Sequence, residues 1–569
     1  MKKYALREKI PDEINKIFEN YSPLVREMLH ARSIVDIESA EKFLNPDYEK
    51  NLHDPFLLKD MRKVVDRVVS AIDSSERIAI YSDYDADGIP GAVTLHDFFK
   101  KIGYENFVNY IPLRNEEGFG LNDEAIDSLA ADGVSLLITI DCGIADIEQI
   151  AVAKKHRLDV IVTDHHIPGK KLPKAFAIIN PKQKGDESPE KMLCGAGVIF
   201  KVIQALISDP RINFPKGQEK WMLDMVGLAT LSDMVPLLGE NRTLAFYGLK
   251  VLQKSPRAGL RAIFGNLRID QRNVTEDDIV FMITPRLNAA SRMGVPMDAF
   301  KLFSTTDEVE AGALAVHLNK KNDERKGLVA SMVKEIKKKI RDRDEQMKNV
   351  LVLGNPEWKP SLLGLVANSF SDEHSRPVFL WGREGTNGSA IIKGSCRSGN
   401  GISVVELMEA AKDIFVEYGG HSGAGGFSVA QENIHRLEEK LNIAFLKLKS
   451  ENSVAEILVD KKLRLADVDW NLYDTVAKFA PFGFENPKPI FLFENVLISA
   501  TKQFGKEKNH LEIKLKENEK EVTAISFFSD PKKFPVPVEV GAKINMVATL
   551  EKSTFRNFPE LRLRIIDIF

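Results

Sequence analysis

Three short, largely apolar runs early in the chain each end abruptly at an acidic residue. They cover residues 78–82, 136–140 and 160–163, and the next residues are Asp83, Asp141 and Asp164. Short apolar runs rich in β-branched residues are typical of parallel strands buried on both faces. Helical stretches follow them, over roughly 90–102, 121–131 and 145–156. This order predicts a parallel α/β sheet, with further strands at 107–111 and 175–179.

The hydrophobic pattern changes twice in the rest of the chain. A helical region reaches about residue 348, and apolar runs at 349–354 and 377–381 then predict a second, smaller α/β unit. Later segments, such as 510–516 and 561–565, alternate apolar and polar residues, which predicts a small antiparallel β-barrel. The predicted organisation is a helical lead-in over 1–75, a parallel-sheet domain over 76–305, a linking helix over 306–348, a smaller α/β domain over 349–448 and a C-terminal barrel over 449–569.

Composition and charge exclude few classes of protein. At 569 residues the chain is too long for one domain, and its 44% hydrophobic and 28% charged residues are ordinary for a globular protein. No apolar run is long enough to span a membrane, and the three cysteines (Cys142, Cys194 and Cys396) lack the spacing of a zinc or redox site. We therefore expect a cytoplasmic protein with no membrane partner. The net charge of −3 gives no overall sign of a nucleic-acid partner, although a local basic groove would not show in that sum.

The acidic strand ends predict a metal site. Ligands of open α/β sheets bind outside the carboxyl ends of the strands, so the three motifs should converge on one edge. The motifs are Asp83-Tyr84-Asp85-Ala86-Asp87-Gly88, Asp141-Cys142-Gly143 and Asp164-His165-His166. Imidazoles beside carboxylates make a mixed nitrogen and oxygen site that suits manganese or magnesium. The sequence therefore predicts a divalent-metal site, with two ions.

Two other interpretations of the first motif fail. A calcium-binding loop needs a glutamate at its twelfth position, which is Thr94 when counted from Asp83, and the segment before the motif is a strand. An aspartyl-phosphate site would fit Asp85 and Asp87, but Ile89 stands where a threonine is usual, and such a site has no use for the two histidines.

Taken together, the motifs resemble those of the DHH phosphoesterases, and among them the single-strand-specific exonucleases. The metal-site motifs, followed by a fourth at 232–236, match the family's pattern in order. The glycine-rich segment 418–427 resembles the signature of the accompanying DHHA1 domain, where missing side chains let a ligand approach the backbone. Segments 239–242, 285–290 and 481–487 resemble the exonucleases in particular. The implied fold is α/β: a parallel-sheet DHH domain and a smaller DHHA1 domain joined by a long helix, with an OB-like barrel.

The resemblance also implies a set of site residues. Two Mn²⁺ or Mg²⁺ ions would be held by Asp85, Asp87, Asp141, His165 and Asp233. Asp83, Asp141 and His166 would be catalytic, with Asp141 bridging the ions and His166 contacting the scissile phosphate or protonating the leaving group. The substrate would contact Arg114, Arg286, Arg292, Ser395, Arg397, Gly419, Gly420, His421, Phe555 and Arg556. Arginine binds phosphate bidentately and aromatic rings stack on bases, which suits these residue types to the role.

Two residues depart from the family's pattern. Ser291 stands where a glycine is usual before Arg292, and Cys396 replaces the middle glycine of a Gly-Ser-Gly-Arg-Ser-like segment. Both lie in candidate DNA-contacting segments. They therefore put recognition of the DNA end in question, rather than the chemistry.

The implied function is a single-stranded-DNA-specific 5′→3′ exonuclease with a two-metal mechanism, in DNA repair and recombination. Its implied partners are single-stranded DNA, a single-strand-binding protein and a RecQ-type helicase, and we expect a monomer. One alternative is a phosphodiesterase of short RNA or cyclic dinucleotides, although such enzymes resemble only the two central domains. Another is an inactive DNA-binding relative, although it should have lost metal-site aspartates. All proposed metal ligands precede Leu237, so we expect truncation near Lys449 to separate the barrel from the chemistry.

Overall fold

The computed structural model describes residues 3–342, 348–383, 390–399, 401–448, 456–505, 508–553 and 558–569. The chain forms two compact units, each built from separate stretches. The sheet unit comprises Pro55–Asp233 and Val251–Ser453, and the barrel unit comprises Met1–Asp54, Met234–Lys250 and Val454–Phe569. The predicted domain boundaries stay predictions. Among the described helices, none has both the length and the apolar composition that crossing a membrane requires.

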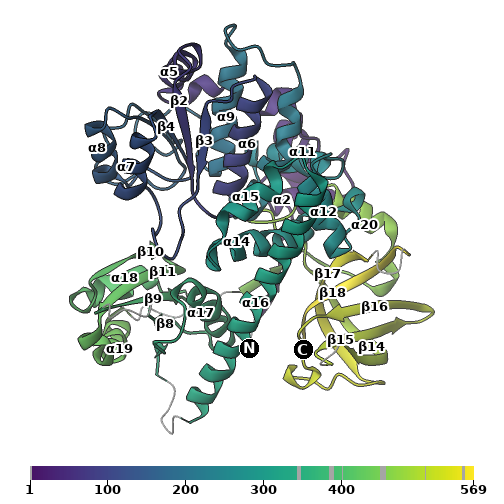
Figure 1. Cartoon of the computed structure of the whole chain (residues 1–569). Coiled ribbons are helices and arrows are strands. Elements are labelled where there is room, and N and C mark those ends of the chain that lie inside the picture. The colour runs from purple at the N-terminus through teal and green to yellow at the C-terminus, as the bar shows by residue number, and fades with distance from the viewer. Residues whose placement is uncertain are drawn as a thin grey trace. The chain divides into compact units, whose positions relative to one another are not determined.

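The predicted parallel sheet is present in the sheet unit. Its strands lie in the order β3 (Phe107–Tyr110), β2 (Arg77–Ser82), β4 (Val134–Ile140), β5 (Asp159–Thr163) and β6 (Ala177–Ile179), and all neighbours are parallel. One face carries α6 (Gly88–Lys101) and α9 (Gly195–Ser208), and the other carries α7 (Asp123–Ala131) and α8 (Ile147–Lys155) (Figure 1). From β2 the chain goes first to β3 on one side and then to β4 on the other. The ends of β2 and β4 therefore form a topological switch point, where such sheets bind ligands.

A second sheet in the same unit matches the predicted smaller α/β region. Its strand order is β10 (Glu417–His421), β11 (Ala424–Ala430), β9 (Ile391–Arg397), β8 (Val378–Gly382) and β7 (Leu351–Gly354). The β7–β8 pair is parallel and the other pairs are antiparallel. Helix α17 (Pro360–His374) packs on β8 and β9. The predicted linking helix is α16 (Glu308–Arg341), whose 34 residues extend about 50 Å at 1.5 Å per residue.

The helices between the two sheets are shorter than α16 and place two of the predicted motifs. Their bounds are α10 (Leu223–Ser232), α11 (Gly239–Leu252), α12 (Ala258–Leu267), α14 (Thr284–Arg292) and α15 (Pro296–Ser304). Asp233 follows α10 directly as its C-cap residue. The segment that resembles the exonucleases at 285–290 lies in α14.

The barrel unit contains the predicted OB-like barrel. Its strands are β14 (Phe491–Phe504), β15 (His510–Glu517), β16 (Lys520–Ser526), β17 (Lys543–Ser553) and β18 (Glu560–Ile568). They pair in the order β14-β15-β16-β18-β17, and a further β14–β17 pairing closes the barrel. The β16–β18 pair is parallel and the others are antiparallel. Alternate residues of β15 are buried, as its sequence predicts.

The N-terminal helices share the core of this barrel. Phe18, Met28 and Phe43, from the region of α1 (Asp12–Ile17), α2 (Pro23–His30) and α3 (Ile37–Leu44), belong to one hydrophobic cluster with Leu511 and Met546 of the barrel. Arg242 on α11, only 2% exposed, donates hydrogen bonds to the carbonyl oxygens of Phe43, Phe479 and Ala480. Arg242, in the exonuclease-like segment 239–242, therefore holds separate segments of the barrel unit together. This shared core argues against the expectation that truncation near Lys449 separates the barrel from the chemistry, because the barrel's core includes residues from the start of the chain.

We expect truncation after Lys449 to destabilise the remaining chain. Phe18, Met28 and Phe43, each at most 6% exposed, would lose their packing partners. At about 1.5–3 kcal/mol per buried large apolar side chain, the loss is about 5–9 kcal/mol, comparable with the stability of a whole domain. Thermal unfolding followed by circular dichroism tests this expectation. A truncated protein that stays soluble and unfolds as cooperatively as the full chain would contradict it.

Candidate metal centre and substrate groove

The sheet brings the three acidic motifs to one edge. Each strand extends its hydrogen-bond ladder by one residue into its motif: the backbone N–H of Asp83 donates to Ile140 O at 3.1 Å, that of Asp141 to Thr163 O at 3.0 Å and that of Asp164 to Ile179 O at 3.0 Å. Equivalent positions of neighbouring parallel strands therefore carry the three carboxylates. This arrangement follows directly from the strand ends seen in the sequence.

Asp141 has a strained backbone. Its φ is +62°, in the left-handed region that non-glycine residues seldom adopt, and its side chain is buried. Such conformations cost about 1–3 kcal/mol and persist where the surrounding structure enforces them, typically at functional sites. The strain is consistent with a residue whose side chain must point in one particular direction.

Several potential ligand atoms meet around His165. Its Nε2 lies 3.1 Å from Asp141 Oδ1, 3.7 Å from Asp87 Oδ2 and 3.6 Å from Asp233 Oδ2. Among the described residues, three groups offer ligand atoms within 4.8 Å of one another: Asp141, His165 and His166; Asp87, His165 and Asp233; and Asp83, Asp85 and Asp141. All predicted metal ligands appear in these groups. Asp141 belongs to two of them, which fits the predicted bridging role.

The start of α9 holds Asp87. The backbone N–H groups of Gly195 and Ala196 donate to its two carboxylate oxygens at 2.5 and 2.8 Å. A Cβ on Gly195 would lie 2.5 Å from the Cβ of Asp141, so only glycine fits between the helix and this ligand. Sequence reasoning missed Gly195. The available signal was a run of small residues opening an apolar helix, where exposed N–H groups favour carboxylates.

The loop that carries Asp85 is shaped by two side-chain oxygens. Asp85 Oδ1 accepts hydrogen bonds from the backbone N–H groups of Asp87 at 2.8 Å and Gly88 at 3.1 Å. The side-chain oxygen of Asn288, on α14, accepts one from Ala86 at 3.1 Å. Asn288 therefore positions the metal-site loop from about 200 residues away in the chain, a role that the sequence did not reveal.

The electrostatics of the cluster fit bound cations. Burial, followed by repulsion from neighbouring carboxylates, raises the pKa of Asp87 to about 7 and that of Asp233 to about 9. The pKa values of Asp83 and Asp141 are raised for the same reasons, and Asp83 Oδ1 is buried with no hydrogen-bond partner among the described residues. Burial lowers the pKa of His165 to about 3, which keeps its ring neutral and able to act as a ligand. Carboxylates this close ionise together only beside positive charge, and oxygen with imidazole nitrogen is a donor set that Mn²⁺ and Mg²⁺ accept.

Asp164 orients His166. Its Oδ1 contacts His166 Nδ1 at 2.8 Å and accepts the backbone N–H of His166 at 3.0 Å, while its Oδ2 accepts the N–H of Ile144 at 2.9 Å. Burial, the largest single cause, lowers the pKa of His166, but the hydrogen bond to Asp164 and the negative charges of Asp164, Asp83 and Asp87 together raise it above its ordinary value. The His166 side chain is 44% exposed. It is therefore the ring of the pair that faces outward, as its predicted role requires.

Lys182 is a further residue of the site that the sequence did not predict. Its Nζ donates to the carbonyl oxygen of His165 at 2.5 Å, and burial lowers its pKa although Asp233, Asp164 and Asp141 oppose this shift. Its charge offsets part of the carboxylate repulsion. The lysine follows the edge strand β6 in an unremarkable segment, so its position is visible only in the folded chain.

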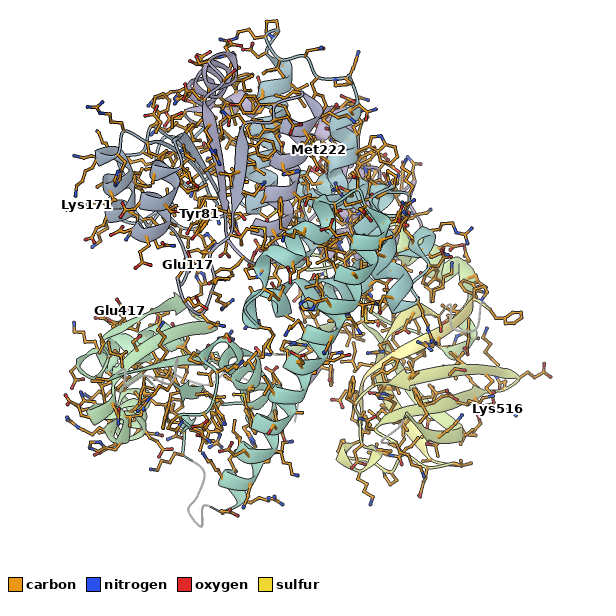
Figure 2. All side chains as sticks on the ribbon, viewed as in Figure 1. Tyr81, Glu117, Lys171, Met222, Glu417 and Lys516 are labelled. Atoms are coloured by element: carbon orange, nitrogen blue, oxygen red, sulfur yellow. The ribbon has the colours of Figure 1, made fainter. Side chains whose placement is uncertain are left out.

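A groove of about 1150 Å³ in the same unit collects several predicted substrate residues. Arg114, Gly419 and Gly420 line it together with Tyr84 and Glu417, the last marked in Figure 2. The Arg114 guanidinium lies over the Tyr84 ring, 5.1 Å from its centre. A Cβ on Gly419 would meet nothing within 4 Å, whereas one on Gly420 would lie 2.3 Å from Ala424 O. Gly420 is thus required by the β10–β11 hairpin, and Gly419 leaves open space on the groove.

Arginines gather next to this groove. Arg292 donates to the carbonyl oxygen of the groove residue Ser361, and burial, followed by repulsion from Arg114, Arg325 and Arg397, lowers its pKa to about 9. Arg397 donates from Nη1 to Ser395 Oγ at 3.1 Å. Clustered guanidinium groups that repel one another favour a bound anion, and arginine binds phosphate bidentately.

Other predicted substrate residues are not placed at the groove. Arg286 is 5% exposed and donates from Nε and Nη2 to Asn319 Oδ1 at 3.0 and 2.8 Å, so it braces α14 against α16 instead of facing a phosphate. His421 ends β10 at the hairpin tip and does not line the groove. Phe555 and Arg556 lie outside the described residues.

The two departures from the family pattern are both buried. Ser291 is fully buried in α14, and its hydroxyl donates to Asn288 O within the helix at 3.1 Å. Cys396 lies in the hydrophobic core on the opposite face of β9 from Ser395 and Arg397, with Sγ 4.0 Å from Met408 Sδ. Neither residue points into the groove.

Comparisons with known proteins define the class first. Models of the DHH family N-terminal domain, the DHHA1 domain and the RecJ OB domain match residues 77–230, 347–447 and 459–567, which makes the chain a DHH-type phosphoesterase by fold and site. The single-stranded-DNA-specific exonuclease RecJ of Bacillus subtilis is 33% identical over 98% of this chain and 69% of its own length, and that of Haemophilus influenzae is 29% identical over 99% of both. The crystal structure of RecJ in complex with Mn²⁺ from Thermus thermophilus superposes with a TM-score of 0.82 at 25% identity, over 100% of this chain and 79% of that one. The chain belongs to the RecJ family.

Proposed function

We propose that this chain is a single-stranded-DNA-specific exonuclease that hydrolyses phosphodiester bonds from the 5′ end, with two Mn²⁺ or Mg²⁺ ions, in DNA repair and recombination. The observation that carries the proposal is the cluster of Asp87, Asp141, His165 and Asp233 in the same unit as the groove that Arg114 lines. Two divalent cations in that cluster would stabilise the attacking and leaving oxygens of an in-line displacement. The relatives from Bacillus subtilis and Haemophilus influenzae are named single-stranded-DNA-specific exonucleases.

The residues of the cluster then have separate roles. Asp85, Asp87, His165 and Asp233 would hold the cations, Asp141 would be shared between them, and Asp83 would add negative charge beside Asp141. Asp164 fixes His166 through Nδ1, which leaves Nε2 as the nitrogen that carries a proton toward the leaving oxygen. A raised pKa keeps a larger fraction of His166 protonated at neutral pH, as a general acid requires.

Arg114, Arg292 and Arg397 with Ser395 would hold the terminal phosphates. These groups bind the backbone and leave the bases unread, so cleavage would not depend on sequence. The glycines at 419 and 420 would let the strand pass close to the hairpin backbone, and His421 at its tip stays a proposed contact.

The two alternatives explain less of the chain. A phosphodiesterase of short RNA or cyclic dinucleotides has no evident use for the closed barrel, which the RecJ OB domain model matches over 459–567. An inactive relative has no need for the strained Asp141, or for a buried Asp83 oxygen that has no hydrogen-bond partner in the described part of the chain.

A labelled-oligonucleotide assay tests the function. The full chain with Mn²⁺ is given single-stranded DNA carrying a label at the 5′ or the 3′ end, and the same sequence as duplex DNA and as RNA. We expect immediate release of the 5′ label as mononucleotide, a slow ladder from the 3′ label, and little cleavage of duplex or RNA. Release of the 3′ label first, or equal cleavage of RNA, would overturn the proposal.

The barrel unit offers an aromatic platform for single-stranded bases. Phe528 is 82% exposed although its φ of +54° is strained for a bulky residue. Its N–H donates to His510 Nδ1 at 3.0 Å, and the two rings pack edge to face at 4.8 Å. Arg564 lies over the neighbouring Phe527, 4.1 Å from the ring centre. OB barrels stack bases on exposed aromatic rings in a groove that also carries positive charge, and Phe528 with the neighbouring Phe527–Arg564 pair supplies both.

We expect Phe528→Ala to weaken binding of long single strands. Loss of one stacked base costs about 1–3 kcal/mol, or about 5–150-fold in affinity. Melting temperature should change little, because the ring is exposed. Fluorescence anisotropy with a long labelled oligonucleotide measures the effect, with Val540→Ala, a 62% exposed apolar residue of the same unit, as the matched control. Equal affinity of Phe528→Ala and the control would exclude this ring from the binding face.

We propose in addition that the protein acts as a cytoplasmic monomer, with a single-strand-binding protein and a RecQ-type helicase supplying its substrate. Size-exclusion chromatography with light scattering tests the monomer, and pull-down with each purified partner tests the contacts.

A further inference from the structure

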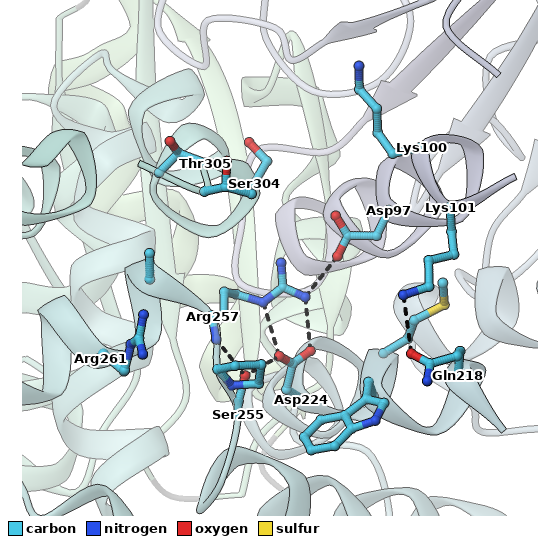
Figure 3. A pocket seen from close by; sticks show the side chains of 15 residues that line it. Asp97, Lys100, Lys101, Gln218, Asp224, Ser255, Arg257, Arg261, Ser304 and Thr305 are labelled. Atoms are coloured by element: carbon cyan, nitrogen blue, oxygen red, sulfur yellow. Dashed lines mark hydrogen bonds and ion pairs between the residues drawn. The ribbon is translucent and has the colours of Figure 1, made fainter. Parts of the chain in front are cut away.

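We propose that a second pocket of the sheet unit, at the opposite end of α6 from the metal cluster, binds a mononucleotide. The pocket has a volume of about 480 Å³ and is shown in Figure 3. Asp87 precedes the first residue of α6 and Lys101 is its last, so the pocket lies about 20 Å from the cluster at 1.5 Å per residue. Its volume is within the range of pockets that take small ligands. None of the predicted metal or substrate residues lines it.

The floor of the pocket is a buried ion-pair network. Arg257 Nη2 lies 2.8 Å from Asp97 Oδ2, and Arg257 Nε lies 3.0 Å from Asp224 Oδ2 (Figure 3). Ser255 Oγ donates to Asp224 Oδ2 at 2.8 Å, and Arg257 also donates to Phe303 O. The single guanidinium of Arg257 thus pairs with two carboxylates, so these three side chains together carry a net negative charge. The Asp97 side chain is 27% exposed, against 3% for Asp224, so Asp97 is the carboxylate that can accept N–H groups from a ligand.

The rim provides an aromatic ring and positive charge. Trp221 is 41% exposed, and Lys254 Nζ lies 5.8 Å from its ring centre. Lys101 reaches across the rim to donate to the side-chain oxygen of Gln218 at 3.1 Å (Figure 3). Lys254 does not itself line the pocket, and among the described residues no carboxylate pairs with Lys101. A base can stack on Trp221 while Lys101 faces a phosphate.

These features together select the ligand class. An inorganic anion would make no use of Trp221 or Asp97, and a neutral apolar ligand would make no use of Lys101 or Asp97. An acidic peptide would match Lys101 but would place like charge against Asp97. A nucleotide can contact Trp221, Asp97 and Lys101 together, because its base is planar, bears N–H donors on its edge and is linked to a phosphate.

Titration of the full chain with 5′-dAMP, followed by quenching of tryptophan fluorescence in Mn²⁺ buffer, tests the proposal. Deoxyadenosine, which lacks the phosphate, and inorganic phosphate, which lacks the base, are the matched ligands. We expect saturable 1:1 binding of 5′-dAMP and binding at least about tenfold weaker for each partial ligand, because each loses one of the two contacts. An acidic hexapeptide is titrated in parallel, and tighter binding of that peptide than of 5′-dAMP would overturn the proposal.

Three variants locate the binding. Trp221→Leu and the exposed Lys101→Glu should each weaken 5′-dAMP binding about tenfold, and Trp221→Leu should also remove the quench, since the other tryptophans (Trp358, Trp381 and Trp470) do not line this pocket. Asp141→Asn, which disables the metal cluster, should bind as the unchanged chain does. Binding lost in Asp141→Asn, or kept in Lys101→Glu, would place the nucleotide at the metal cluster and overturn the proposal, and the Lys101 variant decides the matter even if Trp221→Leu does not fold.

Discussion

Asp141→Asn should reduce cleavage of single-stranded DNA by about 10³-fold or more, with the protein still folded. Asp141 is the carboxylate shared by two of the three ligand groups, so its loss weakens the hold on both proposed cations. A cation that stabilises the transition state contributes several kcal/mol, and each 1.36 kcal/mol is tenfold in rate. Asparagine is the better substitution than alanine, because it tolerates the +62° backbone angle at this position. Initial rates on a 5′-labelled oligonucleotide in Mn²⁺ give the measurement.

Folding and metal binding separate this effect from damage to the structure. Removal of one charge from a crowded carboxylate cluster relieves repulsion, so the metal-free variant should melt no lower than the unchanged chain. Added Mn²⁺ should raise the melting temperature of the unchanged chain by mass action and that of the variant by less. Asp127→Asn, an exposed carboxylate paired with His156, is the control and should behave as the unchanged chain in both assays. Near-normal cleavage by well-folded Asp141→Asn would refute the two-metal proposal.

The sequence predicted that the acidic motifs converge on one edge of the sheet, because the signal for this is local. A parallel strand buried on both faces is a short apolar run, and its end is marked by the first charged residue. Once β2, β4 and β5 were identified, sheet geometry alone placed Asp83, Asp141 and Asp164 side by side. His165 and His166 came with the third strand.

The parts that the sequence did not predict depend on distant segments. The contacts of Gly195 with Asp87, of Asn288 with Ala86 and of Lys182 with His165 come from other helices and a loop. No periodicity in the sequence links those segments to the metal cluster. The N-terminal helices looked like a separate lead-in because their apolar faces do not indicate what covers them. Only the folded chain shows Phe18 and Phe43 in the core of the barrel.

Residue type alone was a poor guide to the DNA path. Arg286 and Arg292 lie in the same helix and looked equivalent, yet the first is buried against Asn319 and the second lies beside Arg114 and Arg397. The burial of a side chain depends on the helix face and on its neighbour α16, which a motif does not encode. The same limit applied to Cys396, which departs from the family pattern but whose side chain lies in the hydrophobic core.

We therefore expect Arg397→Ala to affect DNA binding and Arg286→Ala to affect stability. Arg397 is proposed to bind a phosphate, so its loss should weaken single-strand binding on every sequence and reduce the slope of log affinity against log salt by about one. Its melting temperature should change little. Arg286 makes buried hydrogen bonds to Asn319, so its loss should cost about 1–3 kcal/mol of stability and lower the melting temperature by several degrees.

Anisotropy titrations across a salt series and thermal unfolding of the same preparations give both quantities for each variant. Arg397→Lys is the matched control, because it keeps the charge and loses the bidentate geometry, and it should keep most of the salt slope with a smaller loss of affinity. An unchanged salt slope in Arg397→Ala would remove this residue from the phosphate path. If Arg286→Ala reduced the salt slope of DNA binding and left the melting temperature unchanged, Arg286 would contact DNA. Its buried contact with Asn319 between α14 and α16 would then have to open when DNA binds.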